Sequence, residues 1–251
     1  MELGIAGHVA LVTGAAHGLG AAIASALAKE GCRVGVWDRD GDGANRLVER
    51  IKAAGGDACA LVGSVDNPDE VRELTQAAAA RLGDIQILVN NAGYSADSPI
   101  EKMSDAAWHD IIGVCLTGAF YCTRAVVPAM IARKYGRIIN ISSRAHLGEF
   151  NKVNYCAAKA GLIGMTRALS LDLGPHGITV NAIAPGLVRT ERVQNLPHYA
   201  EINTRSQARQ PIKREGLPTD VADGVLYLAS AGAGFVTGEV LHITGGRYSS
   251  S

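Results

Sequence analysis

Short apolar runs alternate along the chain with longer stretches in which apolar residues recur at helical spacing. The short runs predict strands at 8–13, 33–37, 58–62, 85–89, 137–142, 178–183 and 240–243. The longer stretches predict helices up to about residue 30 and over about 44–53, 69–81, 105–132, 153–173 and 220–229. Strands separated by helices are typical of right-handed βαβ units. We therefore predict an α/β protein with a doubly wound, seven-stranded parallel sheet and helices on both faces.

One segment breaks this alternation. Between Gly186 and Gly216, about 30 residues separate the sixth strand from the last helix, and an insertion of that length in a compact domain is usually functional or mobile. No Pro- or Ser-rich linker divides the rest of the chain. We therefore expect residues 1–251 to form a single domain, with ligands bound beyond the carboxyl ends of the strands.

Composition excludes several classes of protein. The 24 Lys and Arg residues balance 24 Asp and Glu residues, and no basic cluster provides a nucleic-acid footprint. The five cysteines include no C-x-x-C pair and the seven histidines form no ligand motif, so we expect neither disulfides nor a metal site. Residues 3–28 lack Asp, Glu, Lys and Arg, but they include five glycines and follow no basic segment. We expect no signal peptide, no membrane span and a reducing, cytoplasmic location.

A glycine-rich turn over residues 13–20 connects the first strand to the first helix. Gly14, Gly18 and Gly20 would let the backbone approach a pyrophosphate, whose negative charge is favoured by the N–H groups at a helix N-terminus. The spacing differs from the common G-x-G-x-x-G, and the alternative is an ordinary Gly-rich turn. We interpret the turn as a dinucleotide-binding site.

The second strand leads into Asp38, 24 residues after Gly14. A carboxylate at that position accepts hydrogen bonds from ribose hydroxyls and repels a 2′-phosphate, so Asp38 favours NAD over NADP. Arg39 and His17 are the counter-evidence, because either could hold a phosphate. The other interpretation of Asp38 is that it only begins a surface turn.

Tyr155 and Lys159 lie four residues apart in a predicted helix, which places them on the same helix face. Such a pair alone is common, but Ser142 and Ser143 precede Tyr155 by 13 and 12 residues at a predicted strand end. An ammonium group favours deprotonation of a nearby tyrosine hydroxyl. That hydroxyl could then exchange a proton with an alcohol or a carbonyl while hydride moves to or from a nicotinamide.

Two further motifs complete the set, Asn90-Asn91-Ala92-Gly93 after the fourth strand and residues 181–186 after the sixth. With them the chain resembles, over essentially its whole length, the classical branch of the short-chain dehydrogenase/reductase (SDR) family. The resemblance implies a Rossmann fold in which Tyr155 is the general acid/base and Lys159 assists it and holds the nicotinamide ribose. It also implies a serine that binds the substrate oxygen; strand alignment favours Ser143, and the usual spacing favours Ser142 as the alternative.

The resemblance extends to other contacts with the cofactor and the substrate. The expected cofactor-binding residues are Thr13, Gly14, His17, Gly18, Leu19, Gly20, Asp38, Arg39, Ser64, Val65, Asn90, Ala92, Gly93, Tyr155, Lys159, Pro185, Gly186, Val188 and Thr190. The expected substrate-lining residues are Tyr94, Ser95, Ser143, His146, Phe150, Asn151 and Tyr155.

Two positions depart from the family pattern. Ser64 and Val65 stand where an Asp usually contacts adenine, which would weaken that contact. Cys115 stands where the family usually has an Asn whose backbone carbonyl holds a water next to the lysine. Cysteine keeps that carbonyl, so we expect activity to survive. The alternative that Cys115 motivates is a non-catalytic, NAD-binding regulatory protein.

Residues 187–215 are the expected substrate lid. Six basic residues against three acidic ones give the segment a charge of +3. That charge could attract an anionic substrate such as a carboxylate, sulfonate, phosphate or coenzyme A thioester. It could also belong to a solvated, mobile loop, which is the commoner case. The basic residues are Arg189, Arg192, Arg205, Arg209, Lys213 and Arg214.

The activity we predict is NAD-dependent interconversion of a secondary alcohol and a ketone by a homotetramer. The resemblance assigns the interfaces to the long apolar helices and the last strand. The alternative is an NADPH-dependent 3-oxoacyl-thioester reductase, for which Lys134 and His176 partly match the basic residues of acyl-carrier-protein reductases. We predict a small-molecule substrate and neither nucleic acid nor membrane as a partner.

Overall fold

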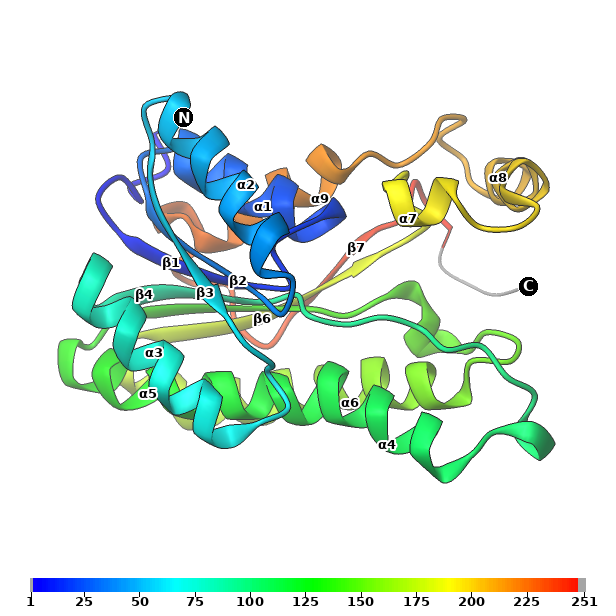
Figure 1. The fold of residues 1–251 in the computed structure, drawn as a ribbon, viewed down its shortest axis with the longest axis horizontal. Coiled ribbons are helices and arrows are strands. Elements are labelled where there is room, and N and C mark those ends of the chain that lie inside the picture. Colours follow the sequence, from blue (N-terminus) through cyan, green and yellow to red (C-terminus); the bar gives the residue numbers. More distant parts are fainter. Residues whose placement is uncertain (1, 248–251) are drawn as a thin grey trace.

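The computed structural model describes residues 2–247, and one parallel sheet runs through it (Figure 1). The strands occur in the order β3-β2-β1-β4-β5-β6-β7, and each hydrogen-bonded pair is parallel. All residues of β1 and β6 are buried, because helices cover both faces of the sheet. The predicted doubly wound, seven-stranded sheet is confirmed. The strands are β1 (Val9–Thr13), β2 (Arg33–Asp38), β3 (Asp57–Val62), β4 (Ile85–Asn90), β5 (Gly136–Ile141), β6 (Ile178–Pro185) and β7 (Val240–Ile243).

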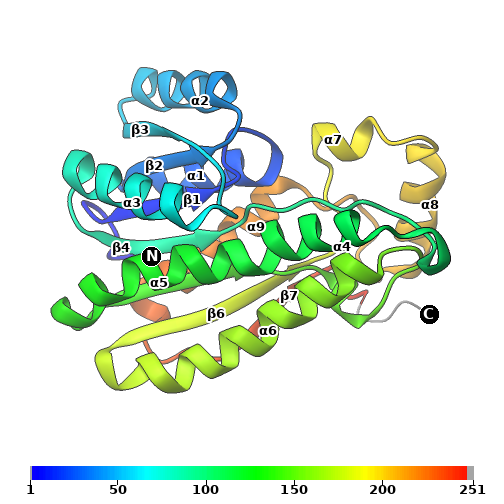
Figure 2. The same cartoon turned by 60° about the horizontal axis from the view of Figure 1, so that its bottom comes forward.

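Two layers of helices enclose the sheet (Figures 1 and 2). One layer contains α1 (Gly18–Lys29), α2 (Gly41–Ala53) and α9 (Pro218–Ala229), and the other contains α3 (Pro68–Leu82), α4 (Asp105–Ile112), α5 (Gly118–Arg133) and α6 (Val153–Leu173). Each layer has its own hydrophobic core. Successive strand residues alternate between them, so that Val12 and Val36 belong to one core and Leu11 and Trp37 to the other.

A π-helical turn, Gly113–Thr117, joins α4 to α5 into one long helix, where the sequence predicted an uninterrupted α-helix. This helix is long and apolar enough to cross a membrane by length and composition alone. In the structure it packs against α3 and α6 and contributes to the core beneath the sheet. We therefore interpret it as a helix that covers one face of the sheet.

Side-chain caps determine where two helices begin. Asp40 accepts a hydrogen bond from the Gly43 N–H at 3.0 Å, and α2 accordingly begins at Gly41, earlier than predicted. Asn67 caps α3, with Pro68 as its first residue. Short 3₁₀ turns lie at Ile100–Lys102, Arg144–Leu147, Gly174–His176 and Ala231–Ala233.

The segment 187–215 contains two helices that the sequence did not predict, α7 (Glu191–Gln194) and α8 (Tyr199–Arg209). It projects beyond the carboxyl end of β6, at the right of Figure 1. A bridge between Val188 and Gly216 ties its two ends together. The segment therefore stands over the edge of the sheet at which the strands end.

Candidate active site

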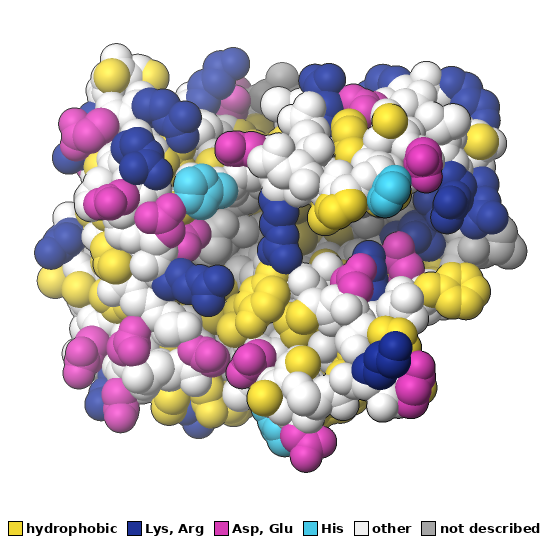
Figure 3. Space-filling view, turned by 45° about the vertical axis from the view of Figure 1, so that its right-hand side comes forward, with side chains coloured by type: hydrophobic (Ala, Val, Ile, Leu, Met, Phe, Trp, Pro, Cys, Tyr) yellow, Lys and Arg dark blue, Asp and Glu magenta, His cyan; other side chains and the backbone are white. Residues whose placement is uncertain are grey.

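A cavity of about 1010 Å³ opens at the carboxyl edge of the sheet. Its walls come from the ends of β2, β5 and β6, from the loops after β1 and β4, and from the 187–215 segment. Figure 3 shows the hollowed face of the molecule, with basic side chains gathered toward its right-hand side. This volume lies at the upper end of the range for ligand pockets, so the cavity can hold a large ligand.

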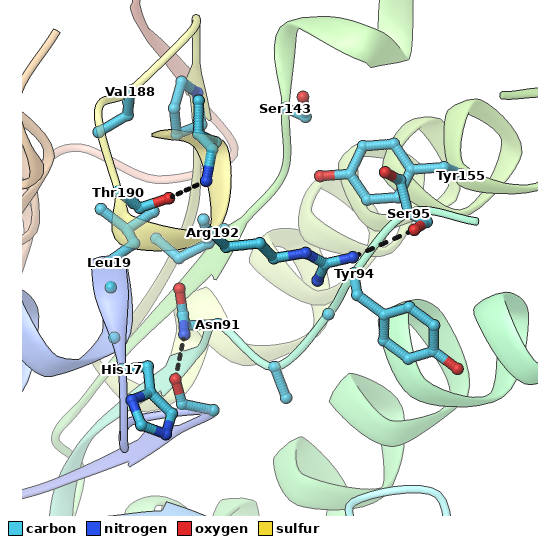
Figure 4. Close-up of a pocket in the computed structure, with 18 of the residues that line it drawn as sticks. His17, Leu19, Asn91, Tyr94, Ser95, Ser143, Tyr155, Val188, Thr190 and Arg192 are labelled. Carbon is cyan, nitrogen blue, oxygen red and sulfur yellow. Dashed lines mark hydrogen bonds between the residues drawn. The ribbon is translucent and has the colours of Figure 1, made fainter. Parts of the chain in front are cut away.

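The glycine-rich turn forms one end of the cavity. Gly14 and Gly18 have φ angles of +63° and +51°, in the left-handed region that favours glycine. A Cβ on Gly20 would lie 2.1 Å from the Gly14 carbonyl oxygen, so only glycine allows this approach. The Asn91 side chain donates to the carbonyl oxygens of Thr13 and Gly14, both at 2.9 Å (Figure 4). The turn thus exposes bare backbone at a helix N-terminus, which fits a pyrophosphate.

Asp38, the last residue of β2, lines the cavity beside this turn. Its Oδ2 accepts the Ala16 N–H at 2.9 Å, and its Oδ1 accepts the Asp40 N–H at 3.0 Å. A carboxylate has about four acceptor sites, so about two are left for a ligand. The two backbone N–H groups thus fix the position of the carboxylate and leave about half of its acceptor sites free.

The two residues that could oppose Asp38 by holding a phosphate have other partners. The ring Nε2 of His17 lies 2.5 Å from the Asp40 carboxylate. The Gly43 N–H, and then His17, lower the pKa of Asp40. The guanidinium of Arg39 lies over the Tyr94 ring, 5.7 Å from its centroid.

Tyr155 and Lys159 lie one turn apart on α6 and both line the cavity. Lys159 is only 3% exposed, and its Nζ donates to the Ile141 carbonyl oxygen at 2.7 Å. The same nitrogen lies 5.5 Å from the centroid of the Tyr155 ring. Within residues 2–247 no carboxylate forms an ion pair with Lys159. Its positive charge therefore acts on the tyrosine and on any ligand in the cavity.

The two serines at the end of β5 have different partners. The Ser142 hydroxyl donates to the Lys159 carbonyl oxygen at 2.8 Å, so its hydrogen is used inside the fold. The Ser143 Oγ instead accepts the Ala145 N–H at 3.1 Å and keeps its own hydrogen available. Figure 4 shows Ser143 and Tyr155 in the same part of the cavity. The geometry therefore favours Ser143 over Ser142 as a donor to a substrate oxygen.

Cys115 lies in the π-helical turn, behind the floor of the cavity. It is 1% exposed, and its thiol contacts the Tyr94 carbonyl oxygen at 3.6 Å. A Cβ on Gly93 would lie 2.9 Å from the Cys115 sulfur and 3.4 Å from the Lys159 nitrogen. A larger residue than glycine at position 93 would therefore displace one of these two side chains.

Several predicted residues lie outside the cavity. Asn90 points into the core, where its amide donates to Asn140 at 2.9 Å and to Thr123 at 3.1 Å, because it is still part of strand β4. The neighbouring Asn91, which was not predicted, faces the glycine-rich turn instead. The Thr13 hydroxyl holds the backbone at residues 91 and 92.

Three predicted substrate residues are also displaced from the cavity. The His146 ring faces His242, with 3.0 Å between their Nε2 atoms. Phe150 is 94% exposed, and Asn151 lines a separate shallow depression. All three lie within the 3₁₀ turn after Ser143 or follow it, in a segment from which Arg144, Glu149 and Lys152 line the cavity instead.

A comparison with protein families identifies the family to which the chain belongs. Residues 14–247 match the family described as "Enoyl-(Acyl carrier protein) reductase", whose members are short-chain dehydrogenases/reductases. The chain belongs to the SDR family. The predicted family is thereby confirmed, and the match covers the glycine-rich turn, both serines, Tyr155 and Lys159.

Individual SDR relatives match the chain over nearly its whole length. It is 42% identical over 245 residues to the (2S)-[(R)-hydroxy(phenyl)methyl]succinyl-CoA dehydrogenase subunit BbsD of Thauera aromatica, with 98% of each chain covered. It is 39% identical over 241 residues to the 3-oxoacyl-[acyl-carrier-protein] reductase FabG of Staphylococcus epidermidis, covering 95% of this chain and 98% of the relative. A 7α-hydroxysteroid dehydrogenase solved with NADH and 7-oxo glycochenodeoxycholic acid superposes with a TM-score of 0.94 at 33% identity, covering 98% and 96% of the two chains.

The other predicted site residues of this SDR protein do line the cavity. They are Gly14, His17, Gly18, Leu19, Gly20, Asp38, Arg39, Ser64, Val65, Ala92, Gly93, Tyr94, Ser95, Ser143, Tyr155, Lys159, Pro185, Gly186, Val188 and Thr190. Sequence analysis missed Asn91, Arg144, Glu149, Lys152 and Arg247 as lining residues. Arg144 adjoins Ser143 in the sequence, but nothing in the sequence shows that its side chain turns inward.

The basic residues of the 187–215 segment mostly have partners within the fold. Arg189 pairs with Glu215 at 3.2 Å, and Lys213 donates to two backbone carbonyl oxygens. Arg214 pairs with Asp220 at 2.7 Å. Arg192 crosses the cavity in Figure 4 and donates to the Ser95 carbonyl oxygen at 3.2 Å. These contacts use much of the positive charge of the segment within the fold, and so leave less of it to attract an anionic substrate.

Proposed function

We propose that this SDR protein is an NAD-dependent oxidoreductase that interconverts a secondary alcohol and a ketone. The observation that carries the proposal is that Tyr155, Lys159 and Ser143 line one cavity, at whose other end lies the glycine-rich turn. The cavity thus offers a proton-transferring hydroxyl, a hydrogen-bond donor and an anion-binding turn, which are the protein's contributions to hydride transfer. Residues 187–215 would act as the substrate lid.

The residues divide the chemistry between them. In oxidation Tyr155 would take the proton of the substrate hydroxyl, and in reduction it would return that proton to the carbonyl oxygen. Ser143 would donate its hydrogen to the same oxygen and stabilise the charge that develops there. Lys159, held by the Ile141 carbonyl, would favour the reactive phenolate by its charge and bind the ribose hydroxyls. The nicotinamide, when bound, accepts or supplies the hydride.

We propose NAD as the cofactor because Asp38 is held by two backbone N–H groups at the end of β2. Its remaining acceptor sites suit ribose hydroxyls, and its charge opposes a 2′-phosphate. The engagement of His17 by Asp40 and of Arg39 by Tyr94 supports the same choice. The 7α-hydroxysteroid dehydrogenase relative was solved with NADH, which is consistent with it.

The relatives favour a second candidate, an NADPH-dependent 3-oxoacyl-thioester reductase. The staphylococcal relative is named as a 3-oxoacyl-[acyl-carrier-protein] reductase, and the Thauera relative is named for a hydroxylated acyl-CoA. Both names describe a secondary alcohol or a ketone on an acyl chain. This candidate would use the same Tyr155 chemistry and differs in its cofactor and substrate. A non-catalytic role stays the third alternative because of Cys115.

We also propose that the enzyme is a cytoplasmic homotetramer acting on a small molecule. Large apolar side chains are exposed on the long helices and before the last strand, notably Phe120, Leu171 and Phe235. Contact with further copies would cover such surfaces. The cysteines at 32, 59, 115, 122 and 156 are all free thiols, as expected in a reducing compartment.

The test is NADH formation at 340 nm with a panel of secondary alcohols that includes carboxylates and acyl thioesters, run in parallel with NADP. Tyr155→Phe should lower turnover about 10²- to 10⁴-fold, while calorimetry should show unchanged NAD binding. Tyr227→Phe is the matched control, since Tyr227 is a surface residue of α9 outside the cavity.

Three outcomes would contradict the proposal in different ways. An unchanged rate in Tyr155→Phe would exclude the assigned mechanism. Cofactor binding without turnover across the panel would favour the non-catalytic alternative. A preference for NADP with thioester substrates would select the reductase.

A further inference from the structure

Two arginines that the mechanism does not use line the cavity, and each has a buried hydrogen-bond donor without a partner within residues 2–247. Arg144 directly follows Ser143 and is only 7% exposed, and Arg247 follows β7; both line the cavity. Arg144 Nη1 and Arg247 Nε are buried, and neither has a hydrogen-bond partner in the described part of the chain. A buried charged donor without a partner is costly, so its presence beside a cavity points to a ligand that completes it.

The nearby carboxylates do not neutralise this end of the cavity. Glu149 lies 3.5 Å from Arg144, but its other oxygen lies 3.4 Å from Lys152. Lys152 is also 3.6 Å from Asp97. Of the three cations Arg144, Lys152 and Arg247, these two carboxylates pair with the first two, and within residues 2–247 neither forms an ion pair with Arg247.

Arg247 has the weakest compensation of the three cations. Among the described residues, 2–247, its side chain donates only to a neutral hydroxyl, that of Ser206, at 3.3 Å from Nη1. Burial lowers the pKa of Arg247, and the positive charges of Arg144 and Arg209 lower it further, against a smaller opposing effect of Glu149. The two arginines line the same cavity and their charges repel each other, so an anion bound near both would relieve that repulsion.

We propose that Arg144 and Arg247 form a subsite for a carboxylate of the substrate, so that the substrate is a secondary alcohol or ketone that carries a free carboxylate. This inference rests on the proposed function, because Ser143 marks the position of the reacting oxygen. Ser143 and Arg144 line the same cavity, so one substrate molecule could present its reacting oxygen to Ser143 and a carboxylate to Arg144. The planar guanidinium fork matches a carboxylate in two parallel hydrogen bonds, which a lysine could not form.

The subsite can be tested through binding, without turnover. Calorimetry on the NADH-loaded protein would compare two matched pairs, 3-hydroxybutanoate with its methyl ester and 3-hydroxyadipyl-CoA with 3-hydroxyhexanoyl-CoA. In each pair only the first member has the free carboxylate, and in the wild type we expect it to bind more tightly. In Arg144→Gln that preference should fall about 10- to 100-fold, and Arg144→Lys should restore part of it.

Two further variants complete the design. Arg247→Gln should reduce the same preference from the other side of the subsite, and it keeps the test open if Arg144→Gln does not fold. Arg205→Gln removes an equal charge from the exposed face of α8, outside the cavity, and should leave the preference unchanged. This control distinguishes a local contact between the two arginines and the carboxylate from a long-range attraction of the carboxylate by the positive charge of the lid.

Equal binding of the two members of both pairs would overturn the inference, as would an equal loss for both members in Arg144→Gln. Binding of 2-hydroxypropylphosphonate as tight as that of 3-hydroxybutanoate would overturn the assignment to a carboxylate. None of these results depends on catalysis. The alcohol panel tests the proposed function separately, and neutral alcohols could still be turned over if the subsite were absent.

Discussion

Replacing Asp38 by Asn should reverse much of the preference of the enzyme for NAD over NADP. The carboxylate uses two acceptor sites on the Ala16 and Asp40 N–H groups and has about two left for the ribose hydroxyls. Asparagine has one acceptor oxygen, so the ribose loses at least one hydrogen bond to a charged group, a loss of about 1.5–3 kcal/mol. This corresponds to NAD binding about 10- to 150-fold more weakly.

NADP should respond in the opposite direction. A 2′-phosphate carries nearly two negative charges, and at about 4 Å each interacts with the carboxylate by about 1 kcal/mol in a water-like dielectric. That lower limit is appropriate because Asp38 is partly exposed beside an open cavity. Removing about 2 kcal/mol of repulsion improves NADP binding roughly 30-fold. Together the two effects change the NAD:NADP ratio by about 300- to 5000-fold.

Isothermal titration calorimetry of both cofactors measures this ratio without knowledge of the substrate. Asp42→Asn is the control, because Asp42 carries the same charge on the exposed first turn of α2 and does not line the cavity. If Asp38 only anchors the backbone, Asp38→Asn will weaken both cofactors equally and leave the ratio unchanged. That result, or tighter NADP binding by the wild type, would refute the reasoning.

Two further predictions concern stability and thiol reactivity. Hydrogen bonds from Arg214 lower the pKa of Asp220 below 3.8, so the stabilisation from this pair is present above that pH and is lost as the pH falls through the lower, folded-state value. In urea unfolding, Asp220→Asn should cost about 1 kcal/mol at pH 7 and less as the pH falls below 3.8; an equal cost at neutral and at acid pH would contradict the assignment. Burial raises the pKa of Cys32 and of Cys122 to about 12. Iodoacetamide at pH 8 should therefore spare both thiols in the native protein and modify them in guanidinium chloride, and mass spectrometry would reveal rapid native labelling if this is wrong.

The parallel sheet could be predicted because its strands are apolar on both faces and are separated by regular helices. The π-helical turn at Gly113–Thr117 could not, since the apolar pattern continues through it and a change in hydrogen bonding leaves no residue signature. The start of α2 was placed too late because Asp40 and Gly41 are typical turn residues, and here the aspartate acts as a cap. Helix α8 was missed because its residues are mostly polar and only Ser206 is buried.

The candidate site, like the fold, could be predicted only in part. Motif spacing located the glycine-rich turn and the pair on α6, because local geometry fixes how such residues are presented. It could not separate Asn90 from Asn91, whose side chains point in different directions where β4 ends. Motif spacing alone favoured Ser142 and strand alignment favoured Ser143; the structure distinguishes them by the bond of Ser142 to the Lys159 carbonyl oxygen, 17 positions away. Side-chain direction at the end of a strand depends on tertiary contacts that the sequence does not display.

The arginines of the proposed carboxylate subsite show which part of substrate recognition the sequence conceals. By charge alone, the sequence directs attention to residues 187–215, whose cations mostly pair with neighbours in the folded chain. Arg144 and Arg247 are 103 positions apart and stand out in no local pattern, yet they line one cavity with unsatisfied donors. Because burying a guanidinium group costs several kcal/mol unless its hydrogens are bonded, one such donor is stronger evidence for an anionic ligand than several charges on an exposed segment.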